Sequence, residues 1–231
     1  MIARIRGVFV AISFAITLLI SILLMYIFRS KNYIIRKYFT KLQTIFMDFS
    51  TKVIGTPDKD TKLYLLNHQS LVDIVAFEAT DDRDKCWVAK KEIEDVPLFG
   101  HIITAPKMIA IDRKDKRSII KIIKLSKERL KEGRVITIFP EGTRGDGETL
   151  LEFQTGAKIL AEKLNLKVQP VVIVNSKYIL DSKKLLSRSG EISIIYLDAV
   201  EPQKGTTWFE DIKENMQKRL NDELANYTSY R

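Results

Sequence analysis

The apolar positions of this chain are most concentrated near its start, in a stretch that runs from Gly7 to Phe28. No charged residue interrupts the stretch, and Leu, Ile, Val and Phe dominate it. A helix of about 22 residues is roughly 33 Å long, enough to cross a hydrocarbon core of about 30 Å. The run is too long for a signal peptide, and no small-residue cleavage site follows it. The pattern therefore predicts a membrane-inserted helix over 7–28.

Basic residues flank this apolar helix and are more frequent after it than before it. Arg4 and Arg6 precede the helix, and the basic residues that follow it are Arg29, Lys31, Arg36 and Lys37. Positive charge accumulates on the cytoplasmic side of membrane helices. We therefore expect the protein at the cell membrane, with its main domain on the cytoplasmic side.

The next stretch, 31–54, is amphipathic. Tyr38, Leu42 and Ile45 recur at helical spacing, and lysines supply charge between them. This predicts a second helix in the membrane interface, which would form a hairpin with the first. Two alternatives stay open. The first helix either spans the bilayer or enters one leaflet only. The second helix could equally well pack on the following domain instead of lying in the membrane interface. The break at Thr56–Asp58 divides the chain into an anchor, 1–56, and a domain, 57–231.

Beyond this break, short apolar runs of strand length alternate with helical patterns. The expected strands are Leu63–Leu66, Trp87–Ala89, Met108–Ile111, Val135–Phe139, Val168–Val174 and Ile192–Leu197. The expected helices are 71–80, 115–132 (ended by Gly133), 155–164 and 207–225. This alternation predicts an α/β fold with a mixed, largely parallel sheet flanked by helices.

The charge balance narrows the class of partner. The chain has 38 basic and 29 acidic residues and a formal net charge of +9. Such an excess fits nucleic acid, an anionic membrane surface or an anionic substrate. Cys86 is the single cysteine and there are two histidines, so the sequence offers neither an intrachain disulfide nor a zinc ligand set of these residues. A magnesium site made of carboxylates alone stays open, but no motif indicates one, and we expect no metal.

Candidate chemistry begins in the segment Asn67–Asp73, which holds one of the two histidines. Ser70 and Asp73 have the spacing of a capping box, so we expect a helix capped by Ser70 with Asp73 in its first turn. His68 would then precede the helix and could fold back onto the Asp73 carboxylate. A histidine oriented by a carboxylate is the arrangement of a general base. These residues alone fit a helix cap beside an ordinary loop histidine equally well.

A second candidate site follows the apolar strand Val135–Phe139. Pro140–Arg144 delivers a carboxylate, a glycine and a guanidinium to the C-terminal end of that strand, where α/β sheets usually bind ligands. Gly142 allows close backbone approach, and Arg144 suits two-point binding of a phosphate. Other cations that also follow strands are Arg113, Lys90 and Lys91. They could converge on one anionic ligand, although a solvated charge explains each of them taken singly.

Together, these motifs resemble those of the glycerolipid acyltransferases, and most closely those of the 1-acylglycerol-3-phosphate O-acyltransferases. Asn67, His68 and Asp73 are similar to N-H-x4-D, and Phe139–Arg144 matches F-P-E-G-T-R letter for letter. The other segments that resemble family blocks are Val88–Glu92 with Pro97 and Gly100, Ile111–Arg113, Phe153–Ala157 and Pro170. The resemblance covers about residues 60 to 200.

The resemblance implies transfer of a fatty acyl group from a thioester of coenzyme A or acyl carrier protein to the sn-2 hydroxyl of lysophosphatidate. His68 would accept the hydroxyl proton, and Asp73 would orient the ring. The residues expected to bind substrate, with their cations at the acceptor phosphate, are Glu141, Gly142, Thr143, Arg144, Arg113 and Lys91. No cofactor and no nucleic acid is implied, and the expected partners are the bilayer, its lipid acceptor and the acyl donor.

Two positions depart from the family pattern and leave the acceptor open. Lys107 replaces a usual glycine and Ala110 a usual bulky residue, so another lysophospholipid or glycerol 3-phosphate is an alternative acceptor. A lipid hydrolase would normally need a Gly-x-Ser-x-Gly elbow, which the sequence lacks. A non-enzymatic phospholipid-binding module fits the charge but gives no reason for the pair His68 and Asp73. His101 has no acid at motif spacing, and we expect it to be structural.

Overall fold

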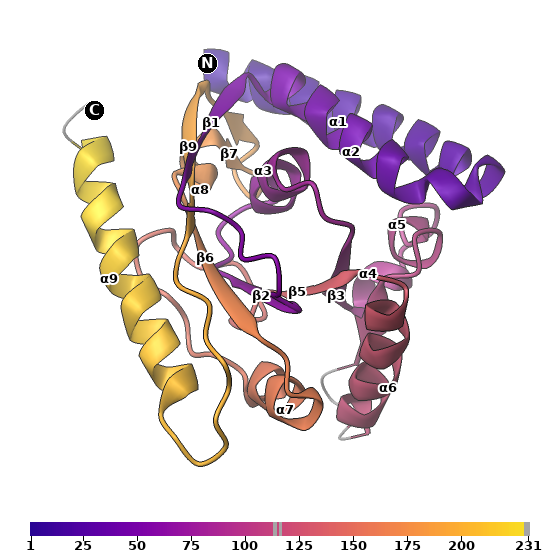
Figure 1. Cartoon of the computed structure of the whole chain (residues 1–231). Helices are drawn as coiled ribbons and strands as arrows, with labels where there is room; N and C mark the ends of the chain where they lie inside the picture. Colours follow the sequence, from indigo (N-terminus) through magenta and orange to yellow (C-terminus); the bar gives the residue numbers. More distant parts are fainter. Residues whose placement is uncertain (113–114, 116, 229–231) are drawn as a thin grey trace.

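The computed structural model describes residues 1–112, 115 and 117–228, and a seven-stranded sheet lies at its centre (Figure 1). The strand order is β1-β9-β6-β2-β5-β3-β4. β6 and β9 pair antiparallel, and the other neighbours in this order pair in parallel. The bounds are β1 Phe49–Ile54, β2 Leu63–Leu66, β3 Lys85–Lys90, β4 Ile109–Ile111, β5 Val135–Ile138, β6 Val168–Val174 and β9 Gly190–Tyr196. The predicted mixed, largely parallel sheet is confirmed.

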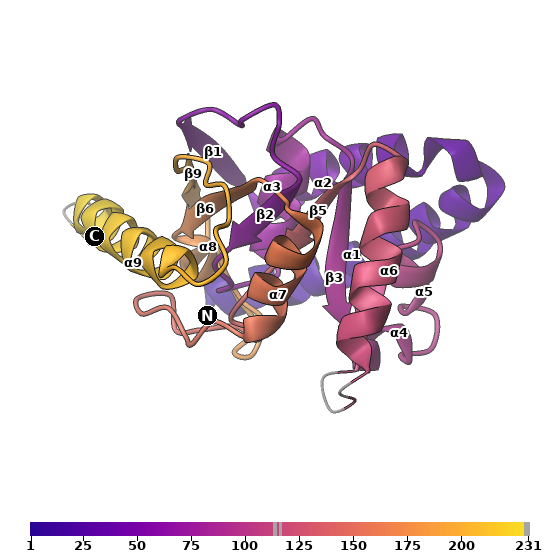
Figure 2. The same ribbon diagram turned by 60° about the horizontal axis from the view of Figure 1, so that its bottom comes forward.

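Each face of the sheet carries its own hydrophobic core, because side chains alternate along a strand. On β6, Val172 lies in the core beneath three helices, whereas Ile173 lies in the core on the opposite face. Figures 1 and 2 show the three helices on one side of the sheet and α3 on the other. The helices are α6 Ser118–Lys131, α7 Thr155–Leu164 and α9 Trp208–Thr228 on the first face, and α3 Val72–Thr80 on the second.

The N-terminal helices form a hairpin that packs over α3 (Figure 1). Helix α1 (Ile2–Ile27) and helix α2 (Asn32–Met47) are joined by the 3₁₀ turn Arg29–Lys31. The two helices bury a shared apolar strip, and Gln43 donates a hydrogen bond of 2.9 Å to the Thr17 hydroxyl. Helix α1 is long and apolar enough to cross a membrane, but one of its faces is buried against the rest of the chain.

The prediction of a helix over 31–54 is wrong beyond Met47. Asp48 adopts a left-handed conformation with φ of 54°, which ends α2, and β1 follows. This strand pairs with β9 from Phe49 to Ile54, so the sheet already includes residues before the predicted boundary at 56. Six residues of alternating character fit a strand and a helix equally well, and the distant partner strand decides between them.

The other predicted elements lie within a few residues of the observed ones. Helix α6 begins at Ser118 rather than 115, and Gly133 follows its end with φ of 80°, as a helix-ending glycine requires. The short elements were not predicted, because neither a single helical turn nor a strand of two residues is long enough to show a period in the sequence. These are α4 Lys91–Glu94, α5 His101–Thr104, α8 Ser176–Ile179, β7 Leu180–Asp181 and β8 Leu186–Ser187.

Candidate active site

The adjacent parallel strands β2 and β5 bring the two sequence motifs together. Both strands end at the same edge of the sheet, so His68 after β2 lies beside Phe139 after β5. The two rings are stacked, with centroids 3.9 Å apart and planes at 12°. Trp87 of β3 continues the aromatic wall, 5.2 Å from Phe139. This convergence at the C-terminal edge of the sheet is the one that the strand pattern predicts.

Asp73 binds the His68 ring as the spacing predicts. The Asp73 Oδ2 atom lies 2.8 Å from His68 Nδ1 and also accepts the backbone N–H groups of Gln69 and Ser70, at 2.6 and 2.8 Å. The carboxylate is completely buried, whereas the imidazole is 16% exposed. Because a carboxylate only accepts hydrogen bonds, Nδ1 carries the ring proton, and Nε2 is the nitrogen that can take up another.

The capping box is only half formed. The Asp73 carboxylate accepts the Ser70 N–H as predicted, but the helix begins at Val72 and the Ser70 hydroxyl accepts the Val72 N–H at 3.3 Å. That hydroxyl also donates to the Leu180 carbonyl at 2.7 Å. The competing carbonyl comes from β7, far along the chain, so the local pattern could not reveal it.

Two further buried polar side chains lie near this pair: Ser176, which the sequence motifs missed, and Asn67, which belongs to the motif but had no contact predicted for it. The Ser176 hydroxyl, on α8 and fully buried, donates a short hydrogen bond to Asp73 Oδ1. Asn67 both donates to the Ile173 carbonyl and accepts the Ile173 N–H, at 2.8 and 2.7 Å, and so extends the pairing of β2 with β6. Ser176 had no sequence signal, because it is 103 residues from Asp73.

Glu141 lies beneath the His68 loop and is not among the residues that line the large cavity beside His68. Its carboxylate accepts the His68 N–H at 2.7 Å and the Leu151 N–H at 2.8 Å. Burial raises the pKa of Glu141, and the two backbone donors only partly offset this effect. The side chain is 4% exposed. These contacts hold the two motif loops together.

The following residues of the motif form the mouth of the cavity. Gly142 has φ of 72°, a conformation that favours glycine, and its N–H donates to the Phe139 carbonyl at 3.0 Å. Thr143 and Arg144 are exposed and line the cavity together with Gly142. The Arg144 guanidinium donates to the Ser182 hydroxyl at 2.7 Å. A guanidinium fixed at the mouth suits an anionic group that enters there.

The cavity itself is large, apolar and walled partly by the hairpin. Its volume is about 500 Å³, and His68 and Phe139 lie at its border with the motif loops. The apolar residues of its walls come from both hairpin helices, α3, β3 and the α5 region, and include Phe14, Leu18, Phe39, Ile74, Val75, Trp87, Phe99 and Ile102. The space is of the size and character of a site for a long aliphatic group.

The remaining predicted cations are placed differently from expectation. Lys90, at the end of β3, lines the cavity, whereas Lys91 is exposed on α4 and is not part of the lining. Arg113 lies outside the described residues. The His101 ring nitrogen Nδ1 is 2.6 Å from the Tyr26 hydroxyl, a contact between α5 and α1. Within the part of the chain that the structure describes, His, Cys, Asp and Glu form no group of three that could hold a metal ion.

Comparisons with known proteins agree with this arrangement. The family model described as Acyltransferase matches residues 50–174. The 1-acyl-sn-glycerol-3-phosphate acyltransferase of Helicobacter pylori is 46% identical over 167 residues, which cover 71% of this chain and 70% of that protein. A protein of the same name from Chlamydomonas reinhardtii is 30% identical, covering 64% of this chain and 44% of its own length.

A solved structure shares the fold. The crystal structure of the 1-acyl-sn-glycerophosphate acyltransferase PlsC from Thermotoga maritima superposes with a TM-score of 0.70 and 20% identity, covering 98% of this chain and 95% of that one. The match includes the N-terminal hairpin as well as the sheet, because it extends over nearly the whole chain. This likeness shows the shared fold, and the family model and the Helicobacter relative establish that this chain belongs to the acyltransferase family.

Proposed function

We propose that this protein transfers an acyl group from an acyl thioester to the sn-2 hydroxyl of lysophosphatidate and so forms phosphatidate. One observation carries the proposal: His68, bound to Asp73, and the guanidinium of Arg144 line the same large apolar cavity. The guanidinium suits the phosphate of the acceptor, and the apolar cavity suits the aliphatic chain of the donor. The name of the Helicobacter pylori relative supports the same acceptor.

In the proposed reaction, the acceptor hydroxyl is the nucleophile. His68 Nε2 takes its proton while the oxygen attacks the thioester carbonyl, and the buried Asp73 carboxylate stabilises the imidazolium through Nδ1. The carbon–sulfur bond then breaks, and the leaving thiolate takes the proton from Nε2. A base of this kind typically contributes about 10² to 10⁴ in rate. The thioester supplies the driving force, so we propose that no cofactor takes part.

The motif loops would bind the acceptor. Arg144 is placed to hold the phosphate, and Lys90 replaces Lys91 as the lysine at the cavity. Thr143 offers a hydroxyl group beside the same mouth, and Gly142, which has no side chain, leaves room for the acceptor there. Glu141 acts on the acceptor only indirectly, through the His68 backbone. A role for Arg113 stays a prediction, as does the choice between coenzyme A and acyl carrier protein as donor carrier.

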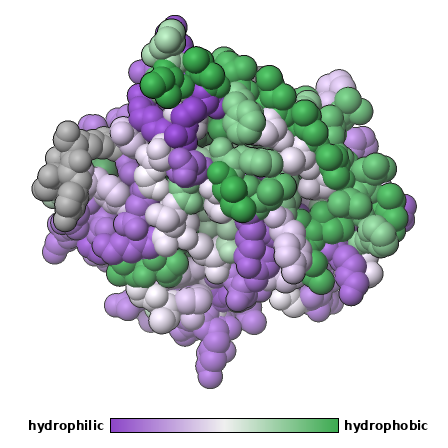
Figure 3. Space-filling model, turned by 90° about the horizontal axis from the view of Figure 1, so that it is seen from above, coloured by the Kyte–Doolittle hydropathy of each residue, from purple (hydrophilic) through white to green (hydrophobic). Residues whose placement is uncertain are grey.

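The hairpin would hold the enzyme at its lipid substrate. Helix α1 exposes a row of large apolar side chains, including Phe9, Ile12 and Leu23 at 55, 56 and 60% exposure. Figure 3, which views the molecule from the hairpin side, shows apolar side chains gathered over this region. We propose that this surface inserts into the cell membrane and that the catalytic domain faces the cytoplasm. In the described part of the chain, one helix is both long and apolar enough to cross a membrane.

The mechanism is tested with purified variants, lysophosphatidate and a labelled acyl thioester. His68→Ala should lower turnover by at least about 10², and Asp73→Asn should do the same, because an amide cannot hold the ring in the required tautomer. His101→Ala is the matched control and should keep most of the activity. Asp73→Ala is unsuitable, since it would leave the buried N–H groups of Gln69 and Ser70 without an acceptor.

The products distinguish the alternatives. Acylated lysophosphatidate supports the proposal, whereas free fatty acid alone would indicate a hydrolase. Transfer to glycerol 3-phosphate or another lysophospholipid, but not to lysophosphatidate, would move the activity to a different acceptor. A His68→Ala protein with wild-type turnover would contradict the mechanism whatever the acceptor.

A further inference from the structure

Three adjacent strands bring side chains to the catalytic pair. β6, β2 and β5 run in parallel and end at one edge of the sheet. His68 follows β2, Glu141 follows β5, and Ser176 follows β6. Asn175, between β6 and Ser176, has φ of 73°, a left-handed conformation at which the strand ends and α8 begins. Ser176 is therefore the contact of a third strand end with the catalytic pair.

Ser176 completes the set of donors around the Asp73 carboxylate. The Oδ2 atom accepts the His68 ring N–H and the backbone N–H groups of Gln69 and Ser70. The Oδ1 atom accepts the Ser176 hydroxyl in a short hydrogen bond. The side chains of Asp73 and Ser176 are both fully buried. Because the two oxygens are held by groups from different elements, the plane of the carboxylate is fixed relative to the imidazole.

This hydrogen bond is not needed to hold α8 in place. The Ser70 hydroxyl donates to the Leu180 carbonyl at 2.7 Å, directly after α8, and Ile179 is fully buried in the core on the α3 side of the sheet. Ser176 is also not among the residues that line the cavity, so it does not touch the substrate. The effect of its hydroxyl is therefore exerted on Asp73.

We propose that Ser176 is a positioning residue for acyl transfer, which acts through Asp73 on the orientation and protonation of the His68 ring. This inference rests on the proposed function. A buried carboxylate depends on its hydrogen-bond donors most strongly when no cation lies beside it. The neutral ring, which is ready to act as the base, gives Asp73 no such cation, whereas the imidazolium does. The Ser176 donor therefore stabilises the state with the neutral ring more than the state with the imidazolium.

Ser176→Ala removes this donor and should change two kinetic quantities. The kcat should fall by roughly 10- to 10²-fold, because small displacements of a catalytic group have costs of this size. The acid side of the pH profile of kcat/KM should move to higher pH, because the carboxylate then favours the imidazolium more strongly. The KM values for lysophosphatidate and for the thioester should stay unchanged, because Ser176 is outside the cavity lining.

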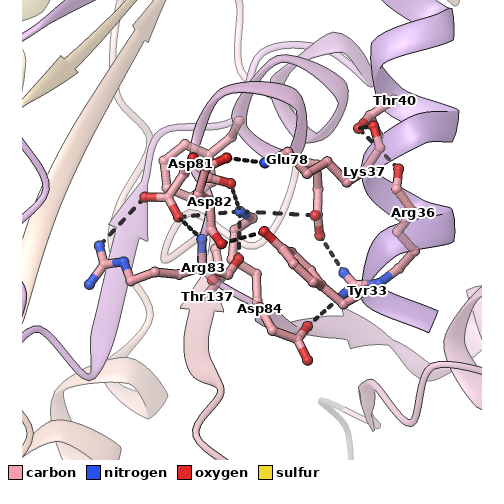
Figure 4. Close-up of polar contacts among 12 residues, drawn as sticks. Tyr33, Arg36, Lys37, Thr40, Glu78, Asp81, Asp82, Arg83, Asp84 and Thr137 are labelled. Atoms are coloured by element: carbon pink, nitrogen blue, oxygen red, sulfur yellow. Dashed lines mark hydrogen bonds and ion pairs between the residues drawn. The ribbon is translucent and has the colours of Figure 1, made fainter. Parts of the chain in front are cut away.

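Charged side chains on the surrounding elements also act on the ring, and the Ser176 variants leave them in place. They are Glu141 and Arg144 after β5, Lys90 at the end of β3, Lys177 on α8 and, on α2 and α3, the ion pair of Arg36 with Glu78 (Figure 4). Because these charges are the same in the wild type and in each variant, a displaced pH profile reports the lost hydrogen bond.

Ser193→Ala is the matched control. Ser193 is also fully buried, and its hydroxyl donates to a buried carboxylate oxygen, Glu223 Oε1, at 2.9 Å. Glu223 lies on α9, which covers the opposite face of the sheet from α3 (Figure 1). Both alanine variants lose a buried hydrogen bond from a serine to a carboxylate and should lower the Tm. Ser193→Ala should nevertheless leave kcat and the pH profile unchanged.

A second pair of variants keeps the shape of the side chain constant. Threonine and valine are nearly equal in shape, but only threonine has a hydroxyl donor. Ser176→Thr should therefore keep the wild-type pH profile and a clearly higher kcat than Ser176→Val. If Ser176→Ala does not fold, this pair decides, and equal kcat values and pH profiles for the two variants would overturn the proposal.

The ring can also be observed without turnover, because the chain has two histidines. In protein that carries isotope-labelled histidine, NMR follows both rings through a pH titration, and His101→Ala assigns the two signals. The His68 signal should titrate at higher pH in Ser176→Ala than in the wild type, whereas the His101 signal should titrate at the same pH in both proteins.

The outcomes separate this inference from the function on which it rests. A wild-type protein that transfers no acyl group overturns the proposed function. An active Ser176→Ala protein with wild-type kcat and an unchanged pH profile overturns the positioning role and leaves the function in place. A change in KM alone also overturns it, because Ser176 would then act on substrate binding. Equal losses of kcat in Ser176→Ala and Ser193→Ala would show a general loss of stability instead of positioning.

Discussion

His68 is held by groups from two parts of the chain, its own segment Asn67–Asp73 and the segment Phe139–Glu141. Asp73 fixes Nδ1, the Phe139 ring stacks on one face, and Glu141 accepts the His68 backbone N–H. The base is therefore oriented before any substrate arrives. Preorganisation of this kind lowers the reorganisation needed in the transition state.

Arg144→Ala should raise the KM for lysophosphatidate with little effect on kcat. A hydrogen bond to a charged group is worth about 1.5 to 3 kcal/mol, so an increase of roughly 10- to 100-fold is expected. Steady-state kinetics at saturating donor measure the change. Ser182→Ala keeps the guanidinium but removes its fixed partner, and should give a smaller increase. An unchanged KM for Arg144→Ala would mean that other cations hold the phosphate.

Glu141→Gln should lower kcat, because an amide cannot accept both backbone N–H groups that the carboxylate accepts. The exposed Glu148, on the same loop, provides the control Glu148→Gln. A variant at Glu141 with wild-type kcat and wild-type stability would show that the bonds to His68 and Leu151 are dispensable.

The same residue predicts a pH dependence of stability. In the unfolded chain the Glu141 carboxyl loses its proton near its ordinary pKa of 4.5, whereas in the folded protein its pKa is raised by burial. Between these two pKa values the folded state binds more protons than the unfolded state. The protonated Glu141 carboxyl therefore contributes to stability. This contribution is complete below pH 4.5 and is lost as the pH rises through the folded pKa. Denaturation from about pH 4 to 8 should show this loss in the wild type relative to Glu141→Gln. If the free energy of unfolding changes with pH in the same way for the two proteins, the prediction is contradicted.

The contact of His68 with Asp73 could be predicted because both residues lie in one short segment with a helix start between them. The hydroxyl of Ser176 and the ion pair of Arg36 with Glu78 could not, since each joins segments that only the folded sheet and hairpin bring together. Motif spacing reports local geometry, and these contacts depend on strand order. The exclusion of Glu141 from the cavity lining has the same origin.

Helix α1 approaches the rest of the molecule most closely at Gly7. A Cβ atom at this position would lie 2.0 Å from the carbonyl oxygen of Leu185, in the turn between β7 and β8. Backbone cannot yield as a flexible side chain can, so Gly7→Ala must shift the helix or the turn. Overpacking of this kind costs about 1 to 3 kcal/mol. Thermal unfolding should show a lower Tm.

Gly156 is the matched control for this substitution. It lies in α7, and a Cβ atom there would meet nothing within 4 Å. Gly156→Ala should leave the Tm unchanged or raise it slightly, because alanine is favoured over glycine in helices by about 0.5 to 1 kcal/mol. If Gly7→Ala melts at or above the wild-type temperature, α1 is not held against the β7–β8 turn.

Long elements with clear periodicity were predictable, and elements defined by distant partners were not. The strand Val168–Val174 and the helix Thr155–Leu164 have the predicted bounds, because their apolar runs and end signals are local. The segment Phe49–Ile54 was assigned to a helix, since the preceding amphipathic pattern runs into it without a glycine or proline. Its pairing with β9 is information that this segment does not contain.

The molecule as a whole combines an exposed apolar face with a net positive charge, the two properties on which the proposed membrane binding rests. The exposed side of α1 contributes the apolar area, and the formal net charge is +9 (Figure 3). Basic residues near an anionic surface each contribute about 1 kcal/mol, screened by salt. Purified protein should therefore float with vesicles, more strongly with anionic than with neutral lipid. Salt should remove the difference but not the binding to neutral vesicles.

The double variant Ile12→Glu and Leu23→Glu provides the control for this experiment. Both side chains are exposed on α1 and neither lines the cavity, so the variant should lose vesicle binding while its fold is kept. Binding that disappears entirely at high salt, even for the wild type, would show that charge alone holds the protein at the bilayer.

Strands β1 and β9 pair in parallel, Phe49 opposite Gly190 and Ile54 opposite Ile195, although most of the chain separates them. During synthesis, α1 and α2 leave the ribosome well before β9 exists. The hairpin can therefore reach the bilayer while β1, directly behind it, still has an open edge that another chain could pair with. Pairings this distant in sequence slow folding. The order of translation thus makes the pairing of β1 with β9 a late step of folding, which under the proposed membrane insertion is completed by a chain already tethered at the bilayer.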